Sequence, residues 1–402
     1  MTKLLAQHGA AKGQKITDSL SKGNIEGAIF SPNDESMESI TKYISETKDL
    51  NFKNTYLDPQ FYFSTFEPNV LKKLSDIPTF PSNIARRDWR KRNPVILEYI
   101  KTHVNNTRIL SETLITPGFY IDNIDWHFDY SVEIYNYCVK EYEFENYALS
   151  LLINTHFFSN KANIEELIDE LDELIEDKDY LYITFCYDNN GDSNYEEMDS
   201  SCLGNILYAL YRLKKNGFKI ILGYTFMNSI LFSMIDCEYI ASGWFNTLRK
   251  FQKNRFDLTD SFGRRKKRYT SIPLLSYIMF DDIENMKLET NEISYSEILS
   301  NSEYDNIFQK DSNSLSFVDL EHQYWESITL ALKKMENEVD LYKRINVMKQ
   351  MITNANTIYK KVIDQLEEDG EKEAVSRIRT VSKHLVTWSD AIDIFKANAL
   401  IV

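Results

Sequence analysis

The chain has 402 residues, a formal net charge of −15, and 43% apolar and 27% charged residues, the composition of a soluble globular protein. Glycine and proline are scarce, at 12 and 8, which excludes collagen-like and low-complexity regions. The acidic balance excludes indiscriminate adhesion to nucleic acid or anionic lipid, so any such contact must be local.

Strand-like and helix-like segments alternate from about residue 25 to 282. The strand-like runs are short and rich in apolar, β-branched or aromatic residues, and the segments between them have helical periodicity. A long irregular insertion at about 63–93 follows the second run. The eight runs are 25–30, 55–57, 108–115, 147–153, 180–187, 218–222, 239–241 and 274–280.

Strands that alternate with helices predict an α/β fold with a parallel sheet covered by helices. Eight of them favour a closed (β/α)8 TIM-like barrel over residues 1–283, and an open doubly wound parallel sheet is the alternative. No glycine-rich dinucleotide or P-loop motif follows any run.

The C-terminal part of the chain has a different character. Residues 317–402 show no strand pattern and predict a C-terminal α-helical bundle broken at Gly370, and the polar segment 284–316 reads as a linker. Helices of this kind often dock a protein partner or mediate self-association, so we expect the protein to bind a partner or to form an oligomer through residues 317–402.

Several strand-like runs end at an acidic residue or a histidine. In barrels and parallel sheets, ligands bind at the carboxyl ends of the strands. Asp34 follows the first run, Asp58 the second, His156 the fourth and Asp188 the fifth, so these four are the candidate catalytic acid/base residues. The alternative is that these residues are polar simply because loops are exposed to solvent, and that a lone histidine is a hydrogen-bonded structural residue.

Two dense basic clusters stand out in this acidic chain, at residues 86–92 and 264–268. Both fall in connections at the predicted carboxyl face of the strands, the second between the seventh and eighth runs. Arginine forks match phosphate oxygens, and Trp89 and Trp244 offer rings on which a base can stack. The alternative is a solvated loop that balances nearby acids or contacts an acidic partner. The candidate phosphate-binding residues are Arg86, Arg87, Arg90, Arg92, Arg249, Arg264, Arg265, Lys266, Lys267 and Arg268.

Four acids, Asp122, Asp125, Asp129 and Glu133, have the spacing of one helix face. Hard carboxylate ligands suit Mg²⁺, so Mg²⁺ is the candidate cofactor, although no metal ligand is assigned. Acids near a helix N-terminus also stabilise the helix dipole, which explains the same pattern without a metal.

The cysteines and the N-terminus bear on the cellular compartment. The four cysteines lie far apart and form no C-x-x-C pair, which argues against a zinc site or a disulfide framework. The N-terminal residues lack a signal-peptide core, and no window approaches a run of about 18 apolar residues. We therefore expect a cytoplasmic protein without membrane contact.

Two functions of different classes remain open at this point. The first is a cytoplasmic barrel enzyme, a hydrolase or transferase, that acts on a phosphate-bearing substrate, either a nucleotide or nucleic acid. The alternative is a non-catalytic barrel subunit of a multi-protein bacterial assembly that docks through its C-terminal helices. The scarcity of glycine favours the alternative, because tight phosphate-binding loops usually need glycine where the backbone approaches the ligand.

Overall fold

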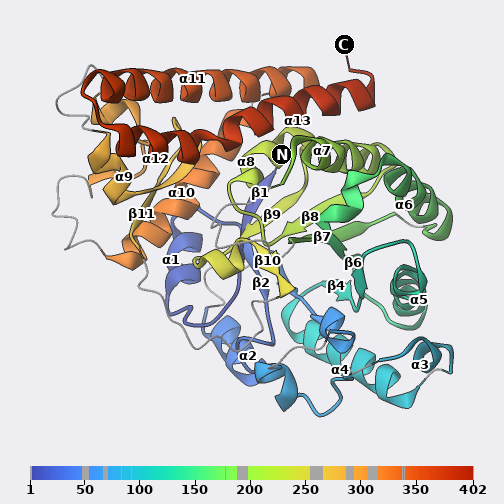
Figure 1. Ribbon diagram of the computed structural model, residues 1–402. Coiled ribbons are helices and arrows are strands. Elements are labelled where there is room, and N and C mark those ends of the chain that lie inside the picture. Colours follow the sequence, from blue (N-terminus) through green and yellow to red (C-terminus); the bar gives the residue numbers. More distant parts are fainter. Residues whose placement is uncertain are drawn as a thin grey trace.

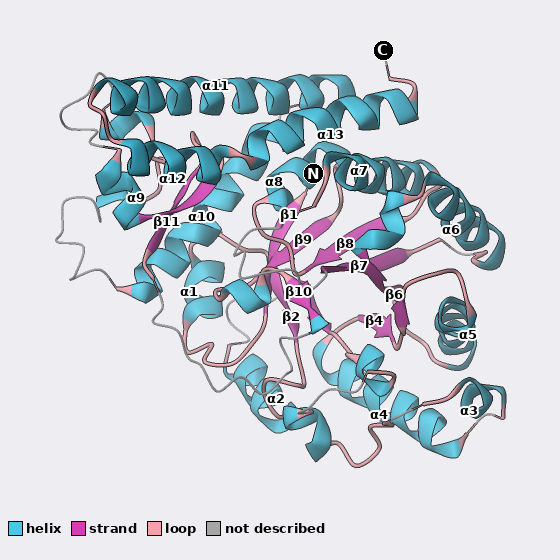
Figure 2. Ribbon diagram, in the orientation of Figure 1, coloured by secondary structure: helices cyan, strands magenta, loops and turns pink. Residues whose placement is uncertain are grey.

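A nearly closed barrel of eight parallel strands, surrounded by helices, forms the body of the protein, and a C-terminal helical region packs beside it (Figure 1). Figure 2 shows the strands gathered at the centre and the helices outside them. The (β/α)8 TIM-like barrel with a C-terminal helical region is therefore confirmed. The computed structural model describes residues 2–47, 54–66, 71–82, 84–91, 93–176, 178–187, 198–253, 266–286, 294–306, 316–336, 338 and 340–401.

The barrel strands follow one another around the barrel in chain order. β9 pairs with β1, which joins the last strand to the first, and the described residues show no ladder between β3 and β4. Two short strands extend the carboxyl ends: β5 (Tyr120–Ile121) pairs with β6, and β10 (Phe251–Gln252) pairs with β7. The barrel strands are β1 (Lys3–Gln7), β2 (Gly27–Phe30), β3 (Asn54–Leu57), β4 (Thr113–Thr116), β6 (Asn146–Asn154), β7 (Tyr180–Tyr187), β8 (Lys219–Gly223) and β9 (Tyr239–Ser242).

Each barrel strand contributes one side chain to a buried interior cluster. Because successive residues of a strand point to opposite faces, the neighbours of these residues face the surrounding helices instead. The interior is thus a packed core and not a channel, as in other barrels of this type. The cluster consists of Leu5, Ile29, Tyr56, Ile115, Ala148, Tyr182, Ile221 and Ala241.

Helix α4 (Pro94–Leu110) supplies hydrogen bonds where β3 and β4 are not paired. His103 Nε2 donates to the backbone oxygen of Ile115 in β4 over 2.8 Å, and Tyr99 OH donates to the oxygen of Pro59 over 2.6 Å. Burial lowers the pKa of His103 to about 4, so the ring is neutral at pH 7. The helix thus satisfies backbone oxygens that a neighbouring strand would otherwise bind.

The eight strands are not quite the eight predicted runs. β1 precedes the first run, and its residues Leu4, Leu5 and Ala6 are buried. The run 274–280 forms β12 (Ser276–Met279), which pairs antiparallel with β11 (Arg268–Ser271) in a separate two-stranded sheet. The prediction of that run as a barrel strand was wrong, and the seventh run, β9, is the last strand of the barrel.

Amphipathic helices cover the outside of the barrel. In α6 the buried residues Ile164, Leu167, Ile168 and Leu171 form the apolar stripe expected from their spacing. Within the predicted insertion lie η3 (Lys72–Asp76) and α3. The covering helices are α1 (Lys15–Ser21), α2 (Met37–Glu46), α3 (Arg86–Arg90), α4, α5 (Trp126–Glu141), α6 (Lys161–Leu174), α7 (Ser200–Lys215) and α8 (Asn228–Phe232). Helix α9 (Phe280–Asn285) packs instead against β12 and α12 (Lys372–Ser382).

The C-terminal helices share the hydrophobic core of the barrel. Helix α13 lies along α7, and a Cβ on Gly204 would come within 2.8 Å of the backbone oxygen of Ala391. The Trp325 Nε1 donates to the oxygen of Ser242 at the end of β9, over 2.8 Å. Among the helices described, none has the length and apolar character of a membrane span. The C-terminal helices are α10 (Phe317–Glu336), α11 (Leu341–Glu368), α12 (Lys372–Ser382) and α13 (His384–Ala399).

Candidate functional site

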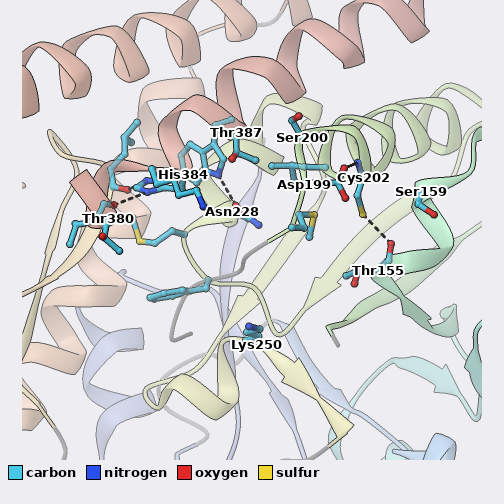
Figure 3. Close-up of a pocket in the computed structure, with 18 of the residues that line it drawn as sticks. Thr155, Ser159, Asp199, Ser200, Cys202, Asn228, Lys250, Thr380, His384 and Thr387 are labelled. Atoms are coloured by element: carbon cyan, nitrogen blue, oxygen red, sulfur yellow. Dashed lines mark hydrogen bonds between the residues drawn. The ribbon is translucent and has the colours of Figure 1, made fainter. Parts of the chain in front are cut away.

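A cavity of about 740 Å³ lies between the carboxyl ends of β6 to β9 and the C-terminal helices α12 and α13 (Figure 3). Its walls include the 3₁₀ helix η4 (Thr155–Ser159) that follows β6, and the first turn of α7. In Figure 3, Thr380, His384 and Thr387 line the side of the C-terminal helices, and Lys250 lies toward the barrel strands. The carboxyl ends of the strands are where barrels of this type bind ligands.

Local hydrogen bonds fix the wall formed by η4 and α7. Asn154 Oδ1 accepts from the backbone N of His156 over 2.7 Å, which sets the direction in which η4 leaves β6. Asp199 caps α7 by accepting from the N of Cys202, and Cys202 Sγ donates to the oxygen of Thr155. The positive end of the α7 dipole therefore faces the cavity beside the exposed side chain of His156.

The opposite wall is held by two side chains of α13. Trp388 Nε1 donates to Oδ1 of Asn228 over 2.9 Å, which ties α13 to α8. His384 lies between two backbone oxygens, with Nε2 at 2.8 Å from Leu275 and Nδ1 at 3.0 Å from Val381. Burial lowers the pKa of His384, so the ring is neutral at pH 7 and donates to one oxygen at a time.

Two lysines bring positive charge to the cavity. Lys250 follows β9, and its Nζ lies 5.2 Å from the centroid of the Tyr187 ring. Lys383 lies at the junction of α12 and α13, and its side chain is exposed. Asp199, the acidic residue of the lining, is the cap of α7, so the cavity is suited to an anionic ligand.

Of the four predicted catalytic residues, His156 lines this cavity and Asp34 and Asp58 do not. The carboxylate of Asp34 is 5% exposed, accepts from Ser31 Oγ over 3.2 Å and lies 3.6 Å from Lys72 Nζ. Asp188 lies outside the described residues.

Asp58 belongs to a buried polar group at the mouth of the barrel. Its carboxylate accepts from the N of Gln60 over 2.9 Å and from Tyr182 OH over 3.2 Å. Burial, and then the Asp58 charge, raise the pKa of Tyr182 well above its usual value. Phe251 of β10 packs edge-on against Tyr224, with ring centroids 5.2 Å apart. The exposed fraction is at most 2% for each of the five side chains Asp58, Gln60, Tyr182, Tyr224 and Phe251. The centre of the mouth is therefore filled by side chains.

The first basic cluster lies on α3, beside the acidic face of α5. Arg86, Arg87 and Arg90 are exposed, while Arg92 lies outside the described residues. Burial and neighbouring acids raise the pKa of Asp129 in α5, and Arg86 opposes that rise. The contacts thus favour a basic loop that balances nearby acids, the alternative that the sequence left open.

Neither predicted stacking residue offers an open ring. Trp89 is 1% exposed and donates through Nε1 to Glu133 over 2.5 Å. Trp244 is fully buried, packs edge-on against Trp325 with centroids 6.0 Å apart, and donates to the oxygen of Ala10 over 3.2 Å. Both rings anchor loops to the protein core.

The described part of the second basic cluster leads into β11, which begins at Arg268. Lys266 Nζ lies 3.9 Å from Asp281, Arg268 Nη1 donates to the oxygen of Tyr277, and Lys267 lies 5.9 Å from the Phe317 ring. Arg264 and Arg265 lie outside the described residues. Helix α3 and strand β11 lie on opposite sides of the barrel in Figure 1. The described parts of the two clusters therefore lie apart.

Arg249, another predicted phosphate-binding residue, is 1% exposed. Its Nε donates to the oxygen of Gly243 over 2.7 Å, and Nη2 donates to that of Trp244 over 3.2 Å. The guanidinium carbon lies 3.5 Å from the centroid of the Tyr324 ring in α10. Arg249 therefore joins the loop after β9 to the C-terminal helices instead of lining the cavity.

The acids proposed for Mg²⁺ do not converge. Asp125 is the cap of α5 and accepts from the N of His127 over 2.9 Å, as expected for acids at a helix N-terminus. Within the described ranges, no three His, Cys, Asp or Glu side chains are placed to hold a metal ion.

Sequence reasoning missed Asp199, Lys383 and His384. Asp199 carried a local signal, because Asp-Ser-Ser before an apolar helix is typical of a helix cap. Lys383 and His384 carried none, since packing alone brings them to the strand ends. Comparison with family models, characterised proteins and solved structures gave no match.

Proposed function

We propose that this protein is an enzyme that binds a phosphate-bearing substrate in the cavity between the strand ends and α12 and α13. The position and charge of the cavity carry the proposal. Its volume of about 740 Å³ suits a small organic ligand, and its lining includes Lys250, which follows β9, and Lys383, at the end of α12. The N-terminus of α7 adds a third positive group that favours phosphate oxygens.

In this proposal the residues have separate roles. Lys250 and Lys383 bind phosphate oxygens as point charges, and the first turn of α7 offers backbone N–H groups. His156 transfers a proton to or from the reacting group, since imidazole serves as acid or base near neutral pH. Phosphate transfer or hydrolysis needs this combination of charge and a proton-transfer group.

A non-catalytic ligand-binding subunit is the second candidate. The packing of Phe251 over Tyr224 favours it, because these buried rings fill the centre of the mouth where barrel enzymes usually place reacting groups. In that case the same cavity binds a ligand without converting it, and the C-terminal helices dock a partner or a second copy of the chain.

Calorimetric titration with inorganic phosphate, pyrophosphate, AMP and ATP tests the binding site. We expect binding that Lys250→Gln and Lys383→Gln weaken about tenfold each, and that Lys101→Gln leaves unchanged. Lys101 is an exposed lysine on α4, outside the cavity, and is the matched control. Failure of all four compounds to bind would refute the proposal.

A second measurement separates the enzyme from the subunit. Release of phosphate from the compounds that bind is followed for the wild type and for His156→Ala. The enzyme requires turnover that His156→Ala lowers at least tenfold while binding persists. Binding without any turnover by the wild type would favour the non-catalytic subunit.

A further inference from the structure

A second hollow of about 570 Å³ adjoins the candidate site. It lies along α12 and the end of α11, and Thr380 and Lys383 line both cavities. The two hollows therefore adjoin at the junction of α12 and α13, and we refer to them together as the groove. Together they exceed the room that one small ligand needs.

The turn between α11 and α12 shapes this second hollow. Gly370 has φ +76, a left-handed conformation that favours glycine, and it allows α12 to fold back beside α11. The fold-back places Arg379 against Glu367, with Nη2 and Oε1 2.5 Å apart. The acidic residue of this lining is thus neutralised within the groove.

Basic side chains form a row along the groove. Lys372, Arg379 and Lys383 are spaced by seven and four residues, which places them on one face of α12, and all three are exposed. With a rise of about 1.5 Å per residue, the row spans about 16 Å. That length exceeds a single phosphate group and corresponds to several phosphates of a nucleotide strand.

Glu367 pairs with Arg379, but the other two cations of this row are not paired with an acid among the described residues. In the part of the chain that the structure describes, neither Lys372 nor Lys383 forms an ion pair. The groove as a whole carries four basic side chains against two acidic ones, in a chain of net charge −15. An excess of positive charge at one place on an acidic protein attracts an anion of matching length.

From this geometry we infer that the ligand is a linear chain of phosphates, held at one end in the cavity and along its length by α12. A short single-stranded oligonucleotide has this chemistry, and inorganic polyphosphate shares it. The inference rests on the proposed anion-binding cavity and extends it, since a mononucleotide is too short to fill the cavity and also contact the row on α12.

Fluorescence anisotropy with labelled thymidine oligonucleotides of two, four, eight and twelve residues tests the inference. We expect affinity to rise with length and to level off once the strand fills the groove. Lys372→Gln should weaken binding of the eight-residue strand several-fold and lower the salt slope by about 0.7, the value for one phosphate contact on a single strand. The same change should leave the binding of AMP unaffected.

Matched variants separate failure of this inference from failure of the proposed function. Lys250→Gln should weaken AMP and the oligonucleotide alike, and Lys101→Gln should weaken neither. Affinity that does not depend on length, with AMP binding intact, would overturn the inference and leave the proposed function standing. Absence of binding to every phosphate compound would overturn both. A loss as large in Lys101→Gln as in Lys372→Gln would also overturn the inference, because binding would then be non-specific.

Competition with inorganic polyphosphate identifies the source of the phosphate chain. Displacement of the oligonucleotide at equal phosphate concentration supports a ligand recognised through its phosphates alone. Resistance to displacement, with the length dependence and the Lys372 effect retained, supports a nucleotide strand whose sugars or bases are also bound. Both outcomes uphold the linear phosphate chain.

Discussion

Substitution of His103 tests how the barrel compensates where the described residues show no ladder between β3 and β4. The ring is 3% exposed, and its Nε2 donates to the oxygen of Ile115 over 2.8 Å. Two variants separate its roles: His103→Gln keeps a donor but does not titrate, and His103→Leu removes both properties. An unsatisfied buried carbonyl oxygen costs about 1–3 kcal/mol, so His103→Leu should lose that much stability at pH 7.5.

The same residue should make the stability of the wild type depend on pH. Burial lowers the pKa of His103 from 6.5 to about 4, so between these values the unfolded chain binds a proton that the folded chain does not. Stability therefore falls as the pH falls through this window. Each pH unit is worth about 1.4 kcal/mol, which gives a loss of about 2 kcal/mol at pH 5 and about 3 kcal/mol at pH 4.

Urea denaturation of the wild type and both variants at pH 7.5 and pH 5 measures these effects. The wild type should lose about 2 kcal/mol more than His103→Gln between the two pH values. Burial also lowers the pKa of His322 and His384, but these residues titrate alike in all three proteins and cancel in the difference. Equal losses in wild type and His103→Gln would refute the assignment of a buried neutral ring.

Three further substitutions test the packing of the barrel and its C-terminal helices. Gly27→Ala would place a Cβ 1.9 Å from a backbone oxygen of β3, so we expect little or no soluble folded protein, measured by expression and circular dichroism. Arg249→Ala removes two hydrogen bonds and a contact with an aromatic ring, and should lower the free energy of unfolding by about 3 kcal/mol in urea. Trp388→Phe removes the bond to Asn228, and should cost about 1 kcal/mol in the same assay while the fold is retained.

The fold was predictable because alternating strands and helices leave few arrangements. The barrel prediction was correct despite an error in one strand. The barrel contains β1, which was not predicted, in place of the predicted run 274–280, so the number of strands is still eight. β1 is only five residues long and carries polar residues at both ends, Lys3 and Gln7, which weakens its apolar signal. The run 274–280 has the local pattern of a barrel strand, but pairing is decided by distant residues, and β12 pairs with β11 instead.

The candidate site was predictable only in part. His156 was found because a position directly after a strand is set by local sequence. The burial of Arg249 was not predictable, because charge alone does not reveal that backbone oxygens and an aromatic ring enclose it. The density of charge at 86–92 likewise gave no sign of the acids on α5 that face it.

The carboxyl face of the barrel has a filled centre and an open side, and the C-terminal helices form one wall of the open side. Asp58 and Tyr182 lie buried at the centre, whereas the open cavity is bounded by β6 to β9 on one side and by α12 and α13 on the other. Because Lys383 and His384 belong to that second wall, the proposed ligand site depends on how these helices pack against the barrel. A partner that shifted α12 would therefore alter the ligand site directly, which joins the enzyme and assembly hypotheses instead of opposing them.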